Sequence, residues 1–146
     1  MYCGSDGGIY VSSNGGTNFT DLTKTIQNGT IYKLAVAKQT SSEMMTGHQD
    51  NGGHAFNTNQ WKNYYGADGM DVAINPLNQN LSYGFIQYGG SLYKSTNAGT
   101  SSGGSVGAPA AETGTNDSGG NWVTPLEINS LGELFAGYSM LYKSTG

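Results

Sequence analysis

Apolar and polar residues alternate over short stretches of this chain, and each stretch ends at a cluster of Gly, Asn, Asp or Ser. Alternation with a period of two predicts β-strands with one buried face, and the clusters predict tight turns. In residues 31–38, for example, Ile31, Lys33, Ala35 and Ala37 are expected on one face and the residues between them on the other. No segment has helical periodicity. Strands are expected over residues 9–13, 18–22, 31–38, 43–47, 54–57, 61–65, 70–74, 81–87, 91–95, 121–126, 133–137 and 140–144.

One phrase, an aliphatic residue followed by Tyr-x-Ser, occurs three times, at residues 9–12, 92–95 and 141–144. The first two copies continue into Asn-x-Gly, whereas the third is cut off at Gly146. A repeated strand-and-turn phrase predicts a chain built of similar modules, none of which buries its own apolar face.

The expected strands fall into sets of four, and sets that repeat at roughly forty residues or more are typical of propeller blades. The predicted fold class is therefore all-β, a partial β-propeller with about two complete four-stranded antiparallel blades and parts of two flanking blades. Such an array is too short to close, and both ends indicate cuts through a longer propeller. The expected divisions of this single segment, 1–146, are residues 1–25 for the end of a blade, 30–65 and 66–126 for two blades, and 127–146 for the start of the next.

Within the blade of residues 66–126, residues 100–118 consist almost wholly of Gly, Ser, Ala and Thr. This composition offers too little apolar area to order the segment, so a flexible insertion is expected there. Residues 121–126 are expected to resume the strand that the insertion interrupts.

The composition agrees with short strands joined by many turns, since the chain has 24 Gly and 10 Tyr but only 11% charged residues. Gly supplies positive φ at turns, and Tyr packs well on pleated surfaces. The net charge of -4 does not favour binding to nucleic acid or to an anionic membrane. No apolar run is long enough to span a bilayer. The single Cys3 excludes an internal disulfide, and no cofactor is expected.

Residues 12–19, Ser-Ser-Asn-Gly-Gly-Thr-Asn-Phe, resemble the Asp-box, Ser-x-Asp-x-Gly-x-Thr-Trp, with Asn in place of Asp and Phe in place of Trp. Residues 95–99 begin a second box, and residues 115–122 supply a box-like ending. On these motifs the chain resembles secreted propellers of the sialidase-repeat and sortilin-like type, especially surface proteins of Bacteroidetes exported by the type IX system. The resemblance implies a propeller at the cell surface or outside the cell, and it implies little about activity.

The box is expected to be a folding device, because Ser and Asn side chains bind backbone groups in a tight turn and Gly takes the positive-φ position. The closing aromatic residue is expected to fill the space between adjacent sheets. The residues assigned to this structural role are Ser12, Asn14, Gly16, Phe19, Ser95, Asn97, Gly99, Asp117, Gly119 and Trp122.

A polar loop over residues 48–54 is the first candidate for ligand binding. His48, Asp50 and Asn51 present hydrogen-bonding groups there, but the same residues also suit a hairpin turn. The spacing of its two histidines matches no standard metal site, so no metal is expected.

A second candidate joins Trp61, Tyr64 and Asp68. Aromatic faces beside a carboxylate are typical of sugar recognition. The structural alternative is that Trp61 packs between blades and that Asp68 caps the turn into the following strand.

A catalytic role rests on a second resemblance. Residues 5–10, Ser-Asp-Gly-Gly-Ile-Tyr, resemble the Thr-Asp-x-Gly-Gly-x-Tyr stretch of xyloglucan-cleaving propeller enzymes, but they are one residue shorter. Glycoside hydrolysis needs two carboxylates across a cleft, so the resemblance implies Asp6 with Asp68 or Asp50 as the pair. A sialidase is excluded because the chain has no Arg to clamp a substrate carboxylate.

Three functions therefore remain open. The first is a non-catalytic repeat segment of a secreted or cell-surface propeller that binds glycan or an extracellular protein. The second is a fragment of a propeller glycoside hydrolase that acts on plant-type polysaccharide such as xyloglucan. The third is a structural subunit of an extracellular filament, in which exposed blade edges pair between copies. The expected partners are glycan, extracellular protein, the rest of the parent propeller and further copies of the chain.

Overall fold

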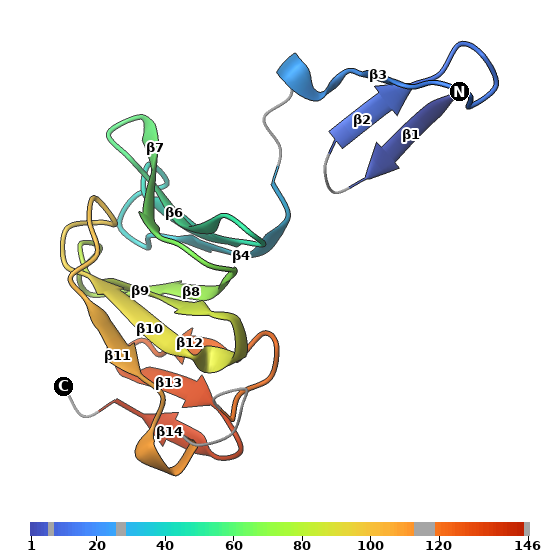
Figure 1. Ribbon diagram of the computed structural model, residues 1–146. Coiled ribbons are helices and arrows are strands. Elements are labelled where there is room, and N and C mark those ends of the chain that lie inside the picture. Colours follow the sequence, from blue (N-terminus) through green and yellow to red (C-terminus); the bar gives the residue numbers. More distant parts are fainter. Residues whose placement is uncertain (6–7, 26–28, 113–118, 145–146) are drawn as a thin grey trace. The chain divides into compact units, whose positions relative to one another are not determined.

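The computed structural model describes residues 1–5, 8–25, 29–112 and 119–144, and most of its regular elements are β-strands (Figure 1). The strands form four antiparallel sheets, two of four strands and two of three, which confirms the predicted all-β fold class. The chain divides into two compact units, the first unit Met1–Thr30 and the second unit Ile31–Gly146. None of the helical turns in the described ranges has the length and apolar character to cross a bilayer.

The first unit holds one sheet, sheet I, with the strand order β1-β2-β3. Its pairing places Tyr10 of the central strand opposite Cys3 on one side and Asp21 on the other. The next turn is tied back to the sheet, because the Ile9 N–H donates to the Thr23 hydroxyl at 3.1 Å. The elements of this unit are β1 (Tyr2–Ser5), β2 (Gly8–Val11), β3 (Thr20–Asp21) and the 3-10 turn η1 (Thr23–Thr25).

The second unit holds three sheets, and the strands of each sheet follow one another in sequence order. Sheet II comprises β4 to β7, sheet III comprises β8 to β11, and sheet IV comprises β12 to β14. Sheet III lies between the other two, since β8 contacts β4 and β5 of sheet II and β12 of sheet IV (Figure 1). The bounds are β4 (Ile31–Val36), β5 (Met44–His48), β6 (Gly52–Asn57), β7 (Gln60–Tyr65), β8 (Gly69–Ile74), β9 (Ser82–Ile86), β10 (Ser91–Ser95), β11 (Ser105–Gly107), β12 (Leu126–Ile128), β13 (Leu134–Gly137) and β14 (Leu141–Lys143), with 3-10 turns η2 (Gln87–Gly89) and η3 (Ala110–Glu112).

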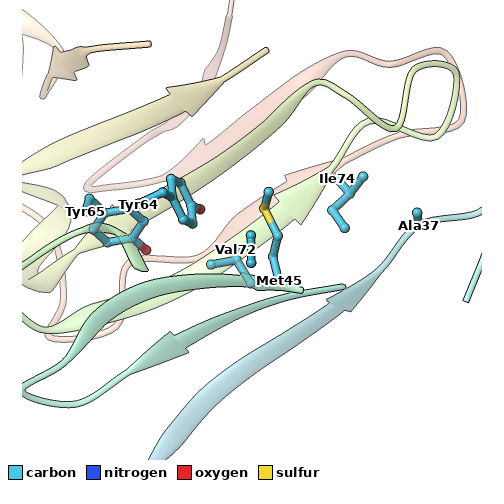
Figure 2. Close-up of a cluster of buried hydrophobic side chains, with 7 residues drawn as sticks. Ala37, Met45, Tyr64, Tyr65, Val72 and Ile74 are labelled. Carbon is cyan, nitrogen blue, oxygen red and sulfur yellow. The ribbon is translucent and has the colours of Figure 1, made fainter. Parts of the chain in front are cut away.

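The II–III junction, where sheets II and III pack face to face, is filled by apolar side chains (Figure 2). Tyr65, at the end of β7, stacks on Tyr93 of sheet III with ring centroids 4.7 Å apart and planes 3° apart. The Tyr65 hydroxyl donates to the Phe85 carbonyl at 3.1 Å, so its polar end is also satisfied across the junction. The buried residues of this junction are Ala37, Met45, Ala55, Tyr64, Tyr65, Val72 and Ile74.

The III–IV junction, between sheets III and IV, contains the second buried cluster. Its centre is Phe85, which is 1% exposed and meets the ring of Tyr138 edge-on at 5.8 Å. Because both faces of sheet III are covered, all six residues of β8 are buried. The buried apolar residues of this cluster are Met70, Ala73, Phe85, Leu126 and Leu134.

Asp71 of β8 joins the innermost strands of all three sheets. Its carboxylate accepts the Leu126 N–H of β12 at 2.9 Å and pairs with the Lys33 ammonium of β4 at 3.2 Å. Lys33 also reaches Glu127 of β12 at 3.2 Å. Burial works against the charge of Lys33, but the Asp71 and Glu127 carboxylates outweigh it and raise the Lys33 pKa. The buried Asp71 therefore ties β4, β8 and β12 to one another.

The Ser-x-Asn-x-Gly turn after β2 is held by its own side chains. The Ser12 hydroxyl donates to Asn14 Oδ1 at 3.0 Å and accepts the Gly16 N–H at 2.8 Å. Asn14 Oδ1 accepts the Asn18 N–H at 3.0 Å, which closes the turn. These bonds replace main-chain pairing where the chain reverses.

The turn after β10 repeats this geometry atom for atom. The Ser95 hydroxyl donates to Asn97 Oδ1 and accepts the Gly99 N–H, each at 2.9 Å. Asn97 Oδ1 accepts the Ser101 N–H at 3.1 Å. The repeated phrase in the sequence is thus a repeated hydrogen-bonded turn, and residues 12–18 and 95–101 are called the box turns below.

The expected flexible insertion differs from the structure over the part that is described. Ser105–Gly107 form β11, the outer strand of sheet III, and this strand pairs with β10. Main-chain pairing needs no apolar side chains, so a segment rich in Gly, Ser, Ala and Thr is ordered here. The strand predicted for residues 121–126 is therefore wrong as the outer strand of sheet III. Residues 121–123 form no strand, and Leu126 begins β12, the first strand of sheet IV.

Glu112 anchors the 3-10 turn η3 to sheet IV. Its buried carboxylate accepts hydrogen bonds from the hydroxyls of Ser139 and Tyr142, the latter at 2.8 Å. These bonds hold the pKa of Glu112 below its ordinary value, because they favour the charged form. The Glu112 carboxylate thus ties η3 to the β13–β14 hairpin.

Candidate functional site

Asp68, in the link between sheets II and III, connects two neighbouring turns. Its Oδ1 accepts the Asp50 N–H at 2.7 Å, from the turn between β5 and β6. Its own N–H donates to Gln87 Oε1 at 3.2 Å, from the turn between β9 and β10. Three turns or links that are separate in sequence therefore meet at one residue, Asp68.

Trp122 and Tyr32 connect the other side of the same turns. The Trp122 indole N–H donates to the Tyr32 hydroxyl at 3.0 Å, and that hydroxyl donates to Gln49 Oε1 at 3.2 Å. The Trp122 carbonyl accepts the Tyr88 N–H at 3.2 Å, and the two rings meet edge-on at 5.1 Å. Trp122 remains 38% exposed, so its ring is available to a ligand.

These contacts close into a ring, because Gln49 precedes Asp50 and Gln87 precedes Tyr88 in the chain. Its members come from the start of β4, two hairpin turns and the two links between sheets. We name this group the turn cluster; it comprises Tyr32, Gln49, Asp50, Asp68, Gln87, Tyr88 and Trp122.

Two members of the turn cluster have positive φ, Asp50 at 60° and Tyr88 at 58°, and so does Ala67 at 65°, which precedes Asp68. Residues other than glycine rarely adopt this backbone conformation, since it costs about 1 kcal/mol or more per residue. The surrounding hydrogen bonds hold these turns in place, and they fix how Asp50 and Tyr88 are presented.

The turn cluster contains the kinds of groups that can bind a polyhydroxylated ligand. It combines an exposed carboxylate at Asp50, a half-buried one at Asp68 and two side-chain amides with aromatic rings. Amide and carboxylate groups bind hydroxyls, while an exposed ring packs on an apolar face.

The predicted loop of residues 48–54 contributes only part of itself to this cluster. Asn51 has a turn role, because its side chain donates to the Gln49 carbonyl at 3.0 Å and its carbonyl accepts from Asn63 at 2.7 Å. His48 instead contacts the Thr46 hydroxyl through Nε2 at 2.7 Å and packs against the His54 ring at 4.5 Å.

The two histidines have lowered pKa values. Burial is the main cause for both, and the charge of His54 adds to it for His48. Within the described ranges, no group of three or more His, Cys, Asp or Glu side chains is arranged to hold a metal ion.

The second predicted cluster is divided by the structure. Tyr64 is buried in the II–III junction, and burial raises its pKa well above the ordinary value. Trp61 packs against Phe56 at 5.2 Å on sheet II and is 52% exposed. Of this group only Asp68 lies in the turn cluster.

The other predicted residues are placed as follows. Asp6, one of the two alternative catalytic residues, and Asp117 lie outside the described residues. Gly119 is described and has a positive φ of 75°, next to Glu112. Phe19 lines a small hollow with Cys3, Ser5 and Tyr10 on sheet I.

Sequence reasoning missed Tyr32, Gln49, Gln87 and Tyr88 as members of a site. Each lies where a strand meets a turn or link, and these positions are ordinary in composition. What these residues share is their position at one end of the stacked sheets. The sequence does not reveal this position, because it arises only when the sheets pack on one another.

Two solved structures are similar to this chain over nearly its whole length. An ancestral GH74 enzyme superposes with a TM-score of 0.59 at 19% identity, over 99% of this chain and 21% of the enzyme. The GH74 enzyme of Niastella koreensis superposes with a TM-score of 0.52 at 16% identity, over 95% of this chain and 20% of the enzyme. The fold is propeller-like. The chain spans about a fifth of the length of these enzymes, and no protein-family profile or curated sequence matches it.

Proposed function

We propose that this chain is a blade segment of a secreted or cell-surface β-propeller and that its turn cluster binds glycan. The observation that carries the proposal is the hydrogen-bonded ring that holds the exposed Trp122 and the carboxylates of Asp50 and Asp68 in one cluster. Loops at one end of a stack of sheets are a common place for ligand sites, because the sheets position them rigidly.

Each part of the turn cluster has a role in this proposal. The Trp122 ring packs on the apolar face of a sugar, and its edge contact with Tyr88 keeps it from rotating. The Asp50 carboxylate accepts hydroxyl groups, while its own N–H is already engaged by Asp68. A neutral, uncharged polysaccharide suits this site better than an acidic one, because both charged groups of the cluster are carboxylates.

Affinity gel electrophoresis with xyloglucan, xylan and mannan tests the proposal. We expect at least one polysaccharide to retard the chain, and the variant Trp122→Ala to weaken this retardation about tenfold or more. The matched control is Trp61→Ala, which removes a Trp that is more exposed (52% against 38%) and lies outside the cluster. A second variant, Asp50→Asn, keeps the main-chain bond to Asp68 and removes only the charge.

Retardation by none of the polysaccharides would contradict the proposal. An equal loss in Trp61→Ala and Trp122→Ala would place the binding outside the turn cluster.

A second candidate function is a segment of a propeller glycoside hydrolase. The similarity to two GH74 enzymes favours it, together with the position of Asp68 among ligand-binding groups. Hydrolysis would need a second carboxylate across a cleft from Asp68. Release of reducing sugar from xyloglucan by the parent protein, abolished in Asp68→Asn but not in Glu127→Gln, would support this function; no release would end it.

A further inference from the structure

The turn cluster is built twice on the same frame, once from sheet II and once from sheet III. Asp50 and Tyr88 each follow a Gln in the turn between the second and third strands of their sheet, with φ angles of 60° and 58°. The N–H of each donates to the link that enters the next sheet, Asp50 to Asp68 Oδ1 at 2.7 Å and Tyr88 to the Trp122 carbonyl at 3.2 Å. We name one such turn residue and its link residue a module, and the cluster contains two modules.

The link residues Asp68 and Trp122 also occupy equivalent positions in the sequence. Each is followed seven residues later by an Asn, Asn75 or Asn129, just after the first strand of its sheet. Both Asn side chains accept the N–H of the residue two positions later, at 2.8 and 3.0 Å. The two modules are therefore aligned by the turns that follow them as well as by their own hydrogen bonds.

The modules share a frame, but they present different side chains. The sheet II module carries two carboxylates, those of Asp50 and Asp68. The sheet III module carries two aromatic rings, those of Tyr88 and Trp122, which meet edge-on at 5.1 Å. Gln87 joins the modules, because it precedes Tyr88 and its side chain accepts the Asp68 N–H at 3.2 Å. An acidic module and an aromatic module are thus neighbours in one cluster.

The carboxylates of the acidic module are not paired with lysines. Of the ion pairs found among the described residues, none includes Asp50 or Asp68. Lys33 of β4 is held by Asp71 and Glu127, at 3.2 Å from each. A cationic group of a ligand would therefore meet two carboxylates without displacing a lysine.

The other ionisable groups near the cluster do not oppose a cation. Glu112, next to the start of the link that carries Trp122, accepts hydroxyl hydrogen bonds from sheet IV and adds negative charge. His48 directly precedes Gln49, and burial lowers its pKa, so it is uncharged at neutral pH. Lys62 belongs to the outer strand β7, where it pairs opposite Ala55.

A ligand with ammonium groups suits both modules. A carboxylate that accepts from an ammonium group forms a charge-assisted hydrogen bond, which is about twice as strong as a bond between neutral groups. Aromatic rings attract cations to their faces, and they also pack on the apolar face of a sugar. Trp122 is 38% exposed and offers such a face. A glycan that carries primary amines has both features, a sugar ring to pack and a cation to pair.

We propose that the turn cluster prefers a glycan with primary amines, a β-linked glucosamine chain of the chitosan type, over a neutral polysaccharide. This inference rests on the proposed glycan-binding function and adds the class of glycan. One sugar ring packs on Trp122, while amines of the same chain pair with the carboxylates of Asp50 and Asp68.

Three probes test the preference on the full 146-residue chain. They are a glucosamine hexamer, cellohexaose, which has hydroxyl groups in place of the amines, and hexalysine, which has amines but no sugar rings. Dissociation constants are measured by titration calorimetry at a single pH at which the amines are protonated. We expect the glucosamine hexamer to bind about tenfold or more tightly than cellohexaose, and also more tightly than hexalysine. About 0.5 M NaCl should remove most of the preference, because salt screens exposed charges.

Variants assign the preference to the acidic module. Asp50→Asn removes one charge and keeps the N–H that binds Asp68, so the preference for amines should fall to about threefold or less. Glu127→Gln, the matched control, removes a carboxylate charge outside the cluster and should leave the preference unchanged. Trp122→Ala should weaken the binding of both oligosaccharides. In NMR spectra the indole N–H signal of Trp122 should shift on binding, while that of Trp61 should not.

Equal affinity for the glucosamine hexamer and cellohexaose would overturn the preference for amines and leave the proposed function standing. Hexalysine that binds as tightly as the glucosamine hexamer would also overturn it, because charge alone would then be recognised. An equal loss of preference in Asp50→Asn and Glu127→Gln would place the recognition outside the acidic module and overturn it as well. Binding of no glycan at all, including xyloglucan, xylan and mannan, would contradict the proposed function too.

Discussion

The II–III and III–IV junctions are built from the same repeated phrase, yet only the first is closed at its outer end. At the II–III junction the Tyr65 ring stacks on Tyr93, and the box turn of residues 95–101 lies against β6. At the III–IV junction the inner part is filled by Phe85 and its neighbours, while the outer part is an apolar groove of about 480 Å³, lined by Val106 of sheet III and by β14.

This difference between the two junctions shows which contacts fill the outer space between two packed sheets. Asn57 of β6 donates its side-chain N–H to the Ala98 carbonyl at 2.6 Å, so the box turn of sheet III is bonded directly to sheet II. The inner strands pack through apolar side chains, whereas at the outer end of the II–III junction a turn and a stacked ring lie between the sheets. A box turn with its outer strand is thus a packing element as well as a hairpin.

Asp71 secures the inner end of both junctions, and its loss should have the largest effect. Asp71→Ala leaves Lys33 without its buried partner and the Leu126 N–H without an acceptor. We expect a loss of about 3 kcal/mol in the free energy of unfolding, measured by urea denaturation.

The matched control for Asp71 is Glu127→Ala, because Glu127 binds the same lysine at the same distance with a side chain that is 75% exposed. Its expected cost is below about 1 kcal/mol. Equal losses in the two variants would mean that burial at Asp71 does not govern the inner ends.

Gly99 tests the closed outer end of the II–III junction. A Cβ at Gly99 would lie 2.2 Å from the Ala55 Cβ, so Gly99→Ala should push the box turn away from sheet II. We expect a loss of about 2–3 kcal/mol from backbone strain and overlap together.

Gly132→Ala separates these two contributions. Gly132 has nearly the same φ, +79° against +72°, but its Cβ would approach only the side chain of Asn75, at 3.0 Å. Its expected cost is about 1 kcal/mol. A cost for Gly99→Ala no greater than this would contradict the packing role of the box turn.

Val106→Phe is expected to fill the apolar groove from sheet III, so that the outer end of the III–IV junction is packed more like that of the II–III junction. The added ring area should raise the free energy of unfolding by about 0.5–1 kcal/mol, as measured by thermal melting. Val106→Thr, which keeps the shape, serves as the control. Destabilisation by Phe would show that the groove is not free to accept a ring.

The histidine pair lies at neither junction and is expected to give the smallest effect. Since burial lowers the pKa of His48 and His54 below the unfolded value of about 6.5, the neutral pair stabilises the fold fully above that pH and less as the pH falls. The melting temperature should therefore decrease slightly from about pH 7.5 to 5.5. His54→Phe should flatten this dependence, and an unchanged slope would contradict it.

The strands were largely predictable, because alternation is written into the sequence. β10 begins at Ser91 and ends at Ser95, as predicted. In β4 a register shift between Ile31 and Lys33 interrupts the predicted alternation, since a bulge depends on the partner strand rather than on composition.

The outer strand β11 was not predictable from composition. Its three residues pair with β10 through main-chain bonds, and the Glu112 carboxylate ties η3 to the β13–β14 hairpin. The turn cluster was unpredictable for a related reason: Tyr32 and Trp122 are 90 positions apart and meet only once the sheets are packed.

Amide hydrogen exchange at Lys94 and Lys143 tests the central claim most directly. The two residues are of the same type and occupy the same position in the repeated phrase, but within the described ranges only the Lys94 N–H donates to an outer segment, at Gly104 just before β11. The structure predicts a strongly protected amide at Lys94 and exchange near the rate of an unstructured peptide at Lys143. Equal protection of the two amides would contradict the account, because both outer edges would then be closed.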